Sequence, residues 1–296
     1  RLKSTCATLW PEFLTSIEEN EVTSILTSSG TTSQTVSQIY IDKETSLRQQ
    51  YALSRSMAHI LGASRLPMLI VDSEQVFKNP AIMSARGAGV LGMMKFGTRH
   101  CFALNHDLSI NIGEIKKFLS KWSGKRFFIF GFTYIVWTTF SEKMKKKGID
   151  LSGGILVHSG GWKKLEEKAV SNNVFRKFMA DNYNLTNIYN FYGMVEQIGS
   201  IFLEGKDGLL YPPDFTEVII RDPVTWDVLP DGEQGVIQVL SIIPKSYPGH
   251  SLLTEDIGRI ETITDEGHVK GKGVRVKGRL PKSELRGCSD VIASGQ

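Results

Sequence analysis

The segment RFFIFGF, residues 126–132, is an arginine followed by a run of apolar residues with a glycine near its end. Such a run is typical of a buried strand and is too short for a helix of its own. Similar runs occur at 66–73 (LPMLIVDS), 154–161 (GILVHSGG) and 187–193 (NIYNFYG). Segments with helical spacing lie between them, and this alternation predicts an α/β sheet with buried strands.

The segments between these runs predict helices. Residues 43–62 carry apolar side chains at helical spacing and end on a glycine, which is a common helix stop. The segment 113–122 is a second predicted helix, and SEKMKKKG (141–148) closes a third. Residues 163–183 predict a long amphipathic helix.

The pattern changes after about residue 205. The stretch 216–243 alternates apolar residues around Asp-Pro and Asp-Gly turns, as antiparallel hairpins do, and 259–279 continues in the same way. We therefore expect an α/β body over residues 1–205 and a β-rich module over residues 206–296.

The composition of the chain bears on two kinds of partner, nucleic acids and membranes. The chain has 296 residues, is 41% hydrophobic and 22% charged, and its net charge of +4 is spread out. The run KMKKK at 143–147 fits a solvated helix end, so no nucleic-acid partner is expected. The apolar stretch 127–140 is shorter than the roughly 20 residues that a membrane helix needs. No membrane span is therefore expected.

The cysteines are few and scattered. Cys6, Cys101 and Cys288 suit neither a disulfide framework nor a zinc site. This usage favours a reducing, cytoplasmic setting.

Hydroxyl groups gather near the N-terminus in TSSGTTS, residues 27–33. The Gly-Lys pair of a nucleotide-binding P-loop is absent, and so is a dinucleotide fingerprint. A loop of small donors that is flexible at Gly30 could still wrap a polyphosphate through N–H and O–H contacts. A surface loop rich in serine and threonine is the alternative.

Five further short motifs follow this loop in a fixed order. They are HSGGWKK (158–164), FYGMVE (191–196), DGEQGVI (231–237), LLTEDIGRI (252–260) and VKGR (276–279). The whole series resembles the adenylate-forming superfamily, whose members condense a carboxylate with ATP to give an acyl-adenylate. The resemblance implies the N-terminal-type fold of these synthetases, with ATP and Mg²⁺ as cofactors.

The resemblance also implies roles for five of the six motifs. The hydroxyl-rich loop would hold the β- and γ-phosphates of ATP through Ser28, Ser29, Gly30, Thr31, Thr32 and Ser33. In the superfamily this loop usually continues with Gly, any residue, Pro and Lys. In this chain Ser33 and Ser37 replace the two ends of that continuation. Neutralisation of the phosphates is then left to Mg²⁺ or to another basic residue.

Four of the remaining motifs would surround the nucleoside and the metal, and DGEQGVI is given no role. Gly160 and Gly161 would let the backbone approach the nucleotide, and Gly193 would form a tight turn. Four side chains would contact the ligands directly. Tyr192 would contact adenine, Glu196 would bind Mg²⁺, Asp256 would bind the ribose hydroxyls, and Arg279 would contact ribose or phosphate. Each of these four residues also has a structural alternative. Tyr192 could be a core aromatic, Glu196 an acid at a helix N-terminus, Asp256 a turn former and Arg279 a surface cation. His158, beside the glycine pair, is expected to be a core or supporting histidine.

Two further segments point to one branch of the superfamily. The chain ends 17 residues after Arg279, so the usual full C-terminal domain with its catalytic lysine is expected to be missing. With IFGFTYIVW (129–137) and GRLPKSELRGCSD (278–290), it is similar to the acyl-protein synthetases of the bacterial luminescence fatty-acid reductase complex, the LuxE family. Members of that family activate a long-chain fatty acid as acyl-AMP and move the acyl group to their own cysteine near the C-terminus.

By position Cys288 matches that acceptor cysteine, and a thiolate is a strong nucleophile. Arg286 and Lys282 stand close to it in sequence and would lower its pKa. Lys282 could also stand in for the missing catalytic lysine. On this resemblance, 1–205 is the ATP- and acyl-binding body, and 206–296 carries the hinge-like motif and the cysteine segment.

The implied partners are a fatty or other carboxylic acid and an acyl-accepting reductase or transferase subunit. The oligomeric state is left open. Two other functions remain: an acyl-CoA ligase of the phenylacetate-CoA ligase type, and a non-catalytic subunit that binds nucleotide or acyl chain.

Overall fold

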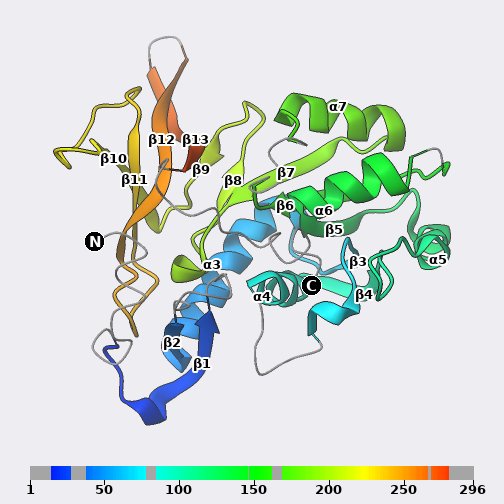
Figure 1. The fold of residues 1–296 in the computed structure, drawn as a ribbon, viewed down its shortest axis with the longest axis horizontal. Helices are drawn as coiled ribbons and strands as arrows, with labels where there is room; N and C mark the ends of the chain where they lie inside the picture. The colour runs from blue at the N-terminus through cyan, green and yellow to red at the C-terminus, as the bar shows by residue number, and fades with distance from the viewer. Residues whose placement is uncertain are drawn as a thin grey trace. The chain divides into compact units, whose positions relative to one another are not determined.

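The computed structural model describes residues 15–27, 38–77, 85–145, 147–161, 169–265 and 268–279 (Figure 1). Their contacts group the chain into two compact units. Unit 1 is drawn from Arg1–Ser56 and Tyr192–Glu284, and unit 2 from Met57–Phe191 and Leu285–Gln296. In this grouping, residues 192–205 belong with the strands that follow them. The boundary expected near residue 205 stays a prediction.

The described part of unit 2 is built on a parallel sheet in the order β7–β6–β5–β3–β4. The strands are β3 (Leu66–Ile70), β4 (Gly97–Phe102), β5 (Phe127–Phe132), β6 (Gly154–Ser159) and β7 (Asn187–Tyr192). β3, β5, β6 and β7 confirm the strands predicted from sequence, and β4 was not predicted. Its sequence, GTRHCF, lacks the apolar run that marks a buried strand.

Helices cover both faces of this sheet, which explains why all six residues of β5 are buried. Phe127 meets Phe118 of helix α5 (Ile112–Trp122) edge to face, with ring centroids 5.5 Å apart. Phe132 has the opposite parity along the strand and faces Gly89 of α4 (Ala85–Met94), where an added Cβ would lie 2.9 Å from its ring. α4 and α5 therefore lie on opposite faces.

A third helical segment follows β5 directly. α6 (Thr133–Thr138) continues into a π-helical turn, η4 (Thr139–Lys143), closed by the Met144 amide donating to the Thr139 carbonyl at 2.9 Å. Trp137 packs on Phe178 of α7 (Asn172–Tyr183), with ring centroids 5.0 Å apart. The helix predicted to close over 141–148 thus ends at Lys143.

α7 is shorter than predicted. The expected helix over 163–183 is wrong at 169–171, which are not helical, while 162–168 lie outside the described residues. Ser171 has extended backbone and its Oγ accepts from the Val174 amide at 3.3 Å, so it caps a helix that begins at Asn172. Asn184 ends the helix in the left-handed region, with φ of 54°.

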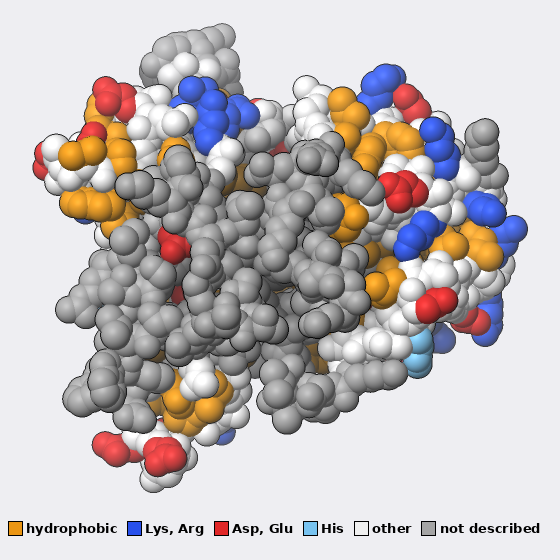
Figure 2. Space-filling view, in the orientation of Figure 1, with side chains coloured by type: hydrophobic (Ala, Val, Ile, Leu, Met, Phe, Trp, Pro, Cys, Tyr) orange, Lys and Arg blue, Asp and Glu red, His pale blue; other side chains and the backbone are white. Residues whose placement is uncertain are grey.

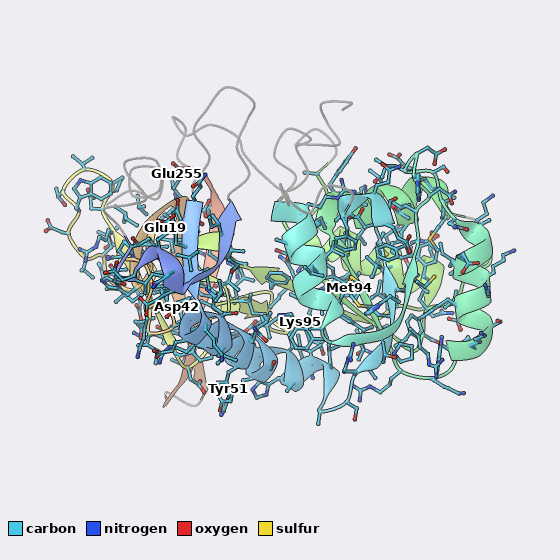
Figure 3. The ribbon with its side chains drawn as sticks, turned by 90° about the horizontal axis from the view of Figure 1, so that it is seen from below. Glu19, Asp42, Tyr51, Met94, Lys95 and Glu255 are labelled. Carbon is cyan, nitrogen blue, oxygen red and sulfur yellow. The ribbon has the colours of Figure 1, made fainter. Side chains whose placement is uncertain are left out.

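Unit 1 begins with a hairpin and with the first part of a helix that continues past Ser56. A 3₁₀ turn, η1 (Glu19–Glu21), precedes β1 (Val22–Thr27), which pairs antiparallel with β2 (Gln38–Asp42). Asp42 then caps α3 (Lys43–Leu61), because its Oδ1 accepts from the Thr45 amide at 2.8 Å (Figure 3). Gly62, at φ of 81°, follows the last helical residue, which confirms the helix predicted over 43–62.

The later strands of unit 1 form an antiparallel sheet in the order β10–β11–β12–β13–β9–β8. The hairpin pattern predicted β10 to β13, whereas β8 and β9 were not predicted. The strands are β8 (Phe202–Glu204), β9 (Leu210–Tyr211), β10 (Thr216–Arg221), β11 (Gly235–Ser241), β12 (Ser251–Asp265) and β13 (His268–Arg279). Their core includes Phe202, Val218, Ile237 and Val274. Two short 3₁₀ turns complete the described elements: η2 (Glu74–Phe77) in unit 2 and η6 (Val195–Gln197) in unit 1.

The surface carries charges of both signs. On the face drawn in Figure 2, lysine and arginine side chains are interspersed with aspartate and glutamate. Among the helices that the structure describes, none is long and apolar enough to span a membrane. The apolar stretch 127–140 is divided between strand β5 and the helical turns after it.

Candidate functional site

The structure joins two of the predicted nucleotide-binding residues. Tyr192 is the last residue of β7, and Asp256 lies on β12. The Tyr192 hydroxyl donates to Asp256 Oδ2 at 2.7 Å, and the ring packs on Phe202 with centroids 5.5 Å apart. An aromatic face and a carboxylate are thus held together, although 64 residues separate them in sequence.

Local hydrogen bonds fix the backbone around Asp256. The Thr254 hydroxyl is buried and donates to the Ile237 carbonyl at 2.7 Å, while the Asp256 amide donates to Thr254 Oγ1 at 3.1 Å. In the pairing of β12 with β13, Asp256 stands opposite Arg279. The TED and KGR motifs therefore meet backbone to backbone on neighbouring strands.

Glu196 lies in the turn η6, three residues after the exposed Gly193. Its side chain is only 4% exposed, and both carboxylate oxygens are buried. The next residue, Gln197, anchors the turn, because its Nε2 donates to the carbonyls of Gly249 at 2.7 Å and Val239 at 3.2 Å. The carboxylate is therefore held on an anchored turn.

The donor chemistry of Glu196 fits Mg²⁺. A buried carboxylate is stabilised by a cation or by donors, and Mg²⁺ is commonly held by one or two carboxylates together with substrate phosphates. The described residues contain no cluster of three or more His, Cys, Asp or Glu side chains that could enclose a metal. Glu196 is therefore chemically suitable as a single carboxylate ligand of Mg²⁺.

A tyrosine that no motif singled out supports this turn. The Tyr247 hydroxyl donates to the backbone carbonyl of Glu196 at 2.7 Å. Burial, and then the charge of Glu196, raise the pKa of Tyr247. The phenol therefore stays protonated and remains a donor at neutral pH.

The predicted glycine pair lies in unit 2, after the carboxyl end of β6. Gly160 has φ of 91°, a conformation that favours glycine, and an added Cβ would lie 3.4 Å from the ring of Phe132. Gly161 follows it, and both glycines are exposed. The carboxyl ends of parallel strands are where ligands bind in open α/β sheets.

His158, just before this pair, is a core residue, as the sequence suggested. It is 3% exposed, its ring stacks on Phe175 with centroids 4.7 Å apart, and Nδ1 lies 2.9 Å from the Thr133 hydroxyl oxygen. Burial lowers the pKa of His158 to about 3, with the charge of Arg176 as a lesser cause. The imidazole is therefore neutral at physiological pH.

The cysteine that the structure describes is a weak nucleophile. Cys101 on β4 lies with its Sγ 3.6 Å from the Glu114 carbonyl oxygen. Burial, and then the charge of Glu114, raise the pKa of Cys101 to about 11. The thiol is protonated at neutral pH, which makes it a useful reference for Cys288.

Several predicted site residues lie outside the described residues. They are Ser28, Ser29, Gly30, Thr31, Thr32, Ser33, Lys282 and Cys288. Arg279 is described through its backbone pairing with Asp256. Conversely, sequence reasoning missed Gln197 and Tyr247, because both act through backbone carbonyls and leave no motif.

Comparison with known families gives a match over residues 9–295 to the family described as acyl-protein synthetase, LuxE. Two curated relatives are each described as a long-chain-fatty-acid–luciferin-component ligase. The protein from Aliivibrio fischeri is 25% identical over 158 residues, which are 52% of this chain and 42% of the relative. The protein from Vibrio harveyi is 25% identical over 185 residues, 60% of this chain and 46% of the relative. These matches cover less than half of either relative.

Solved structures share the fold. An amide bond synthetase from Marinactinospora thermotolerans matches with a TM-score of 0.57 and 17% identity, over 89% of this chain and 50% of that chain. A long-chain-fatty-acid–CoA ligase from Archaeoglobus fulgidus matches with a TM-score of 0.56 and 16% identity, over 89% and 52%. A luciferase-like enzyme from the mealworm Zophobas morio matches with a TM-score of 0.58 and 16% identity, over 90% and 60%. The predicted α/β fold of the adenylate-forming synthetases is confirmed.

Proposed function

The chain belongs to the LuxE family of acyl-protein synthetases, and from this premise we propose that it is an ATP-dependent ligase that charges its own cysteine. It would convert a carboxylic acid and ATP to an acyl-adenylate. It would then carry the acyl group as a thioester on Cys288 for delivery to a partner reductase or transferase. A long-chain fatty acid is the proposed substrate, because both curated relatives are described as ligases of such acids.

The observation that carries this proposal is the hydrogen bond between Tyr192 and Asp256. These are the residues expected at adenine and ribose, and the β12–β13 pairing brings the backbone of Arg279 opposite Asp256. The ring of Tyr192 could stack on a base, and the carboxylate of Asp256 could accept hydrogen bonds from two hydroxyls. Together these two groups suit a nucleoside. Three motifs that are far apart in sequence thus converge within unit 1.

The proposed reaction has two steps that balance. In the first, an oxygen of the substrate carboxylate attacks the α-phosphorus of ATP, and pyrophosphate leaves. In the second, the Cys288 thiolate attacks the acyl carbon, and AMP leaves with the electrons of the broken C–O bond. Mg²⁺, when bound at Glu196, would neutralise charge on the phosphates.

The residues of this chain would prepare those steps. Tyr192 and Asp256 would orient the nucleoside, so that its α-phosphate meets the acid in a fixed position. The hydroxyl-rich loop over 28–33 would hold the terminal phosphates. Lys282 and Arg286 would favour the thiolate form of Cys288. A cytoplasmic location remains part of the proposal.

Two measurements test the function. The chain is incubated with ATP, Mg²⁺ and a panel of carboxylic acids, without coenzyme A. ATP–pyrophosphate exchange then reports adenylation, and intact mass reports acyl-protein. We expect both signals, and neutral hydroxylamine should remove the acyl group, as it does from a thioester.

Two cysteine variants locate the acyl group. Cys288→Ser should keep exchange near the level of the unchanged chain and lose stable acyl-protein, because a serine hydroxyl attacks acyl-AMP poorly. Cys101→Ser is the matched control and should keep both signals, because the Cys101 thiol has a pKa of about 11. Acyl label that persists on Cys288→Ser would contradict self-acylation. If no acyl-protein forms and a parallel incubation with added coenzyme A yields acyl-CoA, the phenylacetate-CoA ligase type is favoured. Absence of exchange would favour a binding subunit.

A further inference from the structure

The connection between β11 and β12, residues 242–250, is anchored to several elements of unit 1. Arg48 of α3 donates through Nε to the Ile243 carbonyl at 3.1 Å. The Ser246 hydroxyl donates to the Tyr40 carbonyl of β2 at 2.8 Å, and its amide donates to Thr45 Oγ1 at 3.2 Å. The connection is therefore fixed against both the hairpin and the helix that follows it.

Tyr247 extends this anchoring to the turn that carries Glu196. Its side chain is 8% exposed and packs with Ile39 and Ile41 of β2 and with Val195 of η6. Its hydroxyl donates to the Glu196 carbonyl at 2.7 Å. One side chain thus contacts both the strand that follows the hydroxyl-rich loop in sequence and the turn of the expected metal ligand.

Gln197 makes a second attachment from the turn to the same connection. Its Nε2 bonds the carbonyls of Gly249 and Val239, and the side chain is 1% exposed. The packing here is close, because a Cβ added at Gly249 would lie 2.8 Å from the Glu196 carbonyl oxygen. The turn is consequently held twice, through the backbone carbonyl of Glu196 and through the side chain of Gln197.

We propose that Tyr247 and Gln197 are positioning residues, which fix the Glu196 turn against the 242–250 connection so that the carboxylate meets the nucleotide-bound Mg²⁺ at a set place. This rests on the proposed function. η6 is a three-residue turn and has too few internal hydrogen bonds to define its own position. A displacement of about 1 Å in a reacting group can cost about 100-fold in rate, so such anchors matter.

The test compares two tyrosines in matched settings. Tyr247→Phe keeps the ring on Ile39 and Ile41 and removes the donor to the Glu196 carbonyl. Tyr183→Phe is the control, because Tyr183 is also buried and its hydroxyl donates to the Phe140 carbonyl in unit 2. Both variants should lose similar thermal stability. Tyr247→Phe alone should raise the Mg²⁺ concentration for half-maximal pyrophosphate exchange, by about 5- to 10-fold, with the KM of the acid within about 2-fold.

A binding measurement supplies a readout besides activity. Mn²⁺ replaces Mg²⁺ in the presence of ATP, and its bound fraction is followed by electron paramagnetic resonance. The dissociation constant should rise by the same factor in Tyr247→Phe and stay unchanged in Tyr183→Phe. Gln197→Met, which removes the second attachment, should give the same shift and keeps the test sharp if Tyr247→Phe does not fold.

The outcomes separate this inference from the proposed function. An unchanged chain that neither exchanges pyrophosphate nor binds Mn²⁺ with ATP would overturn the proposed function, and the inference with it. An active chain in which Tyr247→Phe behaves like Tyr183→Phe would overturn the positioning role alone.

Discussion

At the scale of single residues, Asp256 combines one observed contact with one proposed contact. Its carboxylate accepts from the Tyr192 hydroxyl, and its proposed ligands are the two hydroxyls of a ribose. Asp256→Asn keeps one acceptor oxygen and loses the charge. Because hydrogen bonds to a charged group contribute about 1.5–3 kcal/mol, the KM for ATP in pyrophosphate exchange should rise about 10- to 150-fold. The KM for the acid should change little.

Asp231→Asn is the control for that variant. Asp231 accepts from the Thr262 hydroxyl at 2.7 Å and pairs with Lys272 at 2.9 Å in the same unit. A surface pair of this kind contributes about 0–1 kcal/mol, so neither KM should move. If Asp256→Asn raised both KM values equally, the assignment to the nucleotide would be wrong.

The candidate site was only partly predictable from single residues. Tyr192, Glu196 and Asp256 stand in motifs, and the hydrogen bond between the first and the last could not be foreseen because it depends on strand pairing. Tyr247 stands in SYPGH, which matches no motif, and it acts on a backbone carbonyl that any residue would present. Positioning residues of this kind leave no sequence pattern.

At the scale of elements, α7 shows how a cap overrides periodicity. Apolar spacing continues back toward residue 163, yet the helix begins after Ser171, whose side chain accepts from the Val174 amide. Ser171→Ala should therefore lower the free energy of unfolding by about 0.5–2 kcal/mol, and Ser171→Asp should preserve it. Urea unfolding measures both. A helix that ran through 171 would give the opposite sign, because alanine is the better residue inside a helix.

The other elements differ in how far sequence could define them. β5 was predictable because all six of its residues are buried under helices on both faces. The hairpins of the later strands of unit 1, β10 to β13, were predictable from alternation and turn residues. β4 was not, because its threonine, arginine and histidine give it no apolar run, and it became a strand by pairing with β3. Tertiary pairing therefore decided what local pattern could not.

At the scale of the whole molecule, stability should fall with acid in two ranges. The pKa of His158 is lowered from 6.5 to about 3, so the unfolded chain takes up a proton first. Its contribution is complete above about pH 6.5 and falls by up to about 1.4 kcal/mol per pH unit down to about pH 3. Hydrogen bonds and nearby cations also lower the pKa of carboxyl groups: Asp107, Asp150, Asp222, Asp231 and, to about 2, Glu261.

The carboxyl groups contribute to the free energy of unfolding above about pH 4, and this contribution is lost below that pH. The loss of stability between about pH 6.5 and pH 4 is therefore assigned to His158. The measurement is the free energy of unfolding between pH 7 and pH 4.5, from urea titrations of the unchanged chain and of His158→Asn. The variant should be less stable at pH 7 and show a flatter dependence on pH. An identical slope in the two proteins would refute the assignment.

The π-helical turn η4 has a consequence for how this chain tolerates changes in length. Because the Met144 amide reaches back five residues to Thr139, the turn holds one residue more than an α-helical turn would. Loss of a single codon here would let an ordinary helix form in its place. The residues after the turn would keep nearly their present direction, because four residues closed by an α-helical bond turn the chain through nearly the same angle as five closed by the π-helical bond. Natural relatives that lack one residue at this position are therefore expected to keep the packing of α6 on α7, including the contact of Trp137 with Phe178.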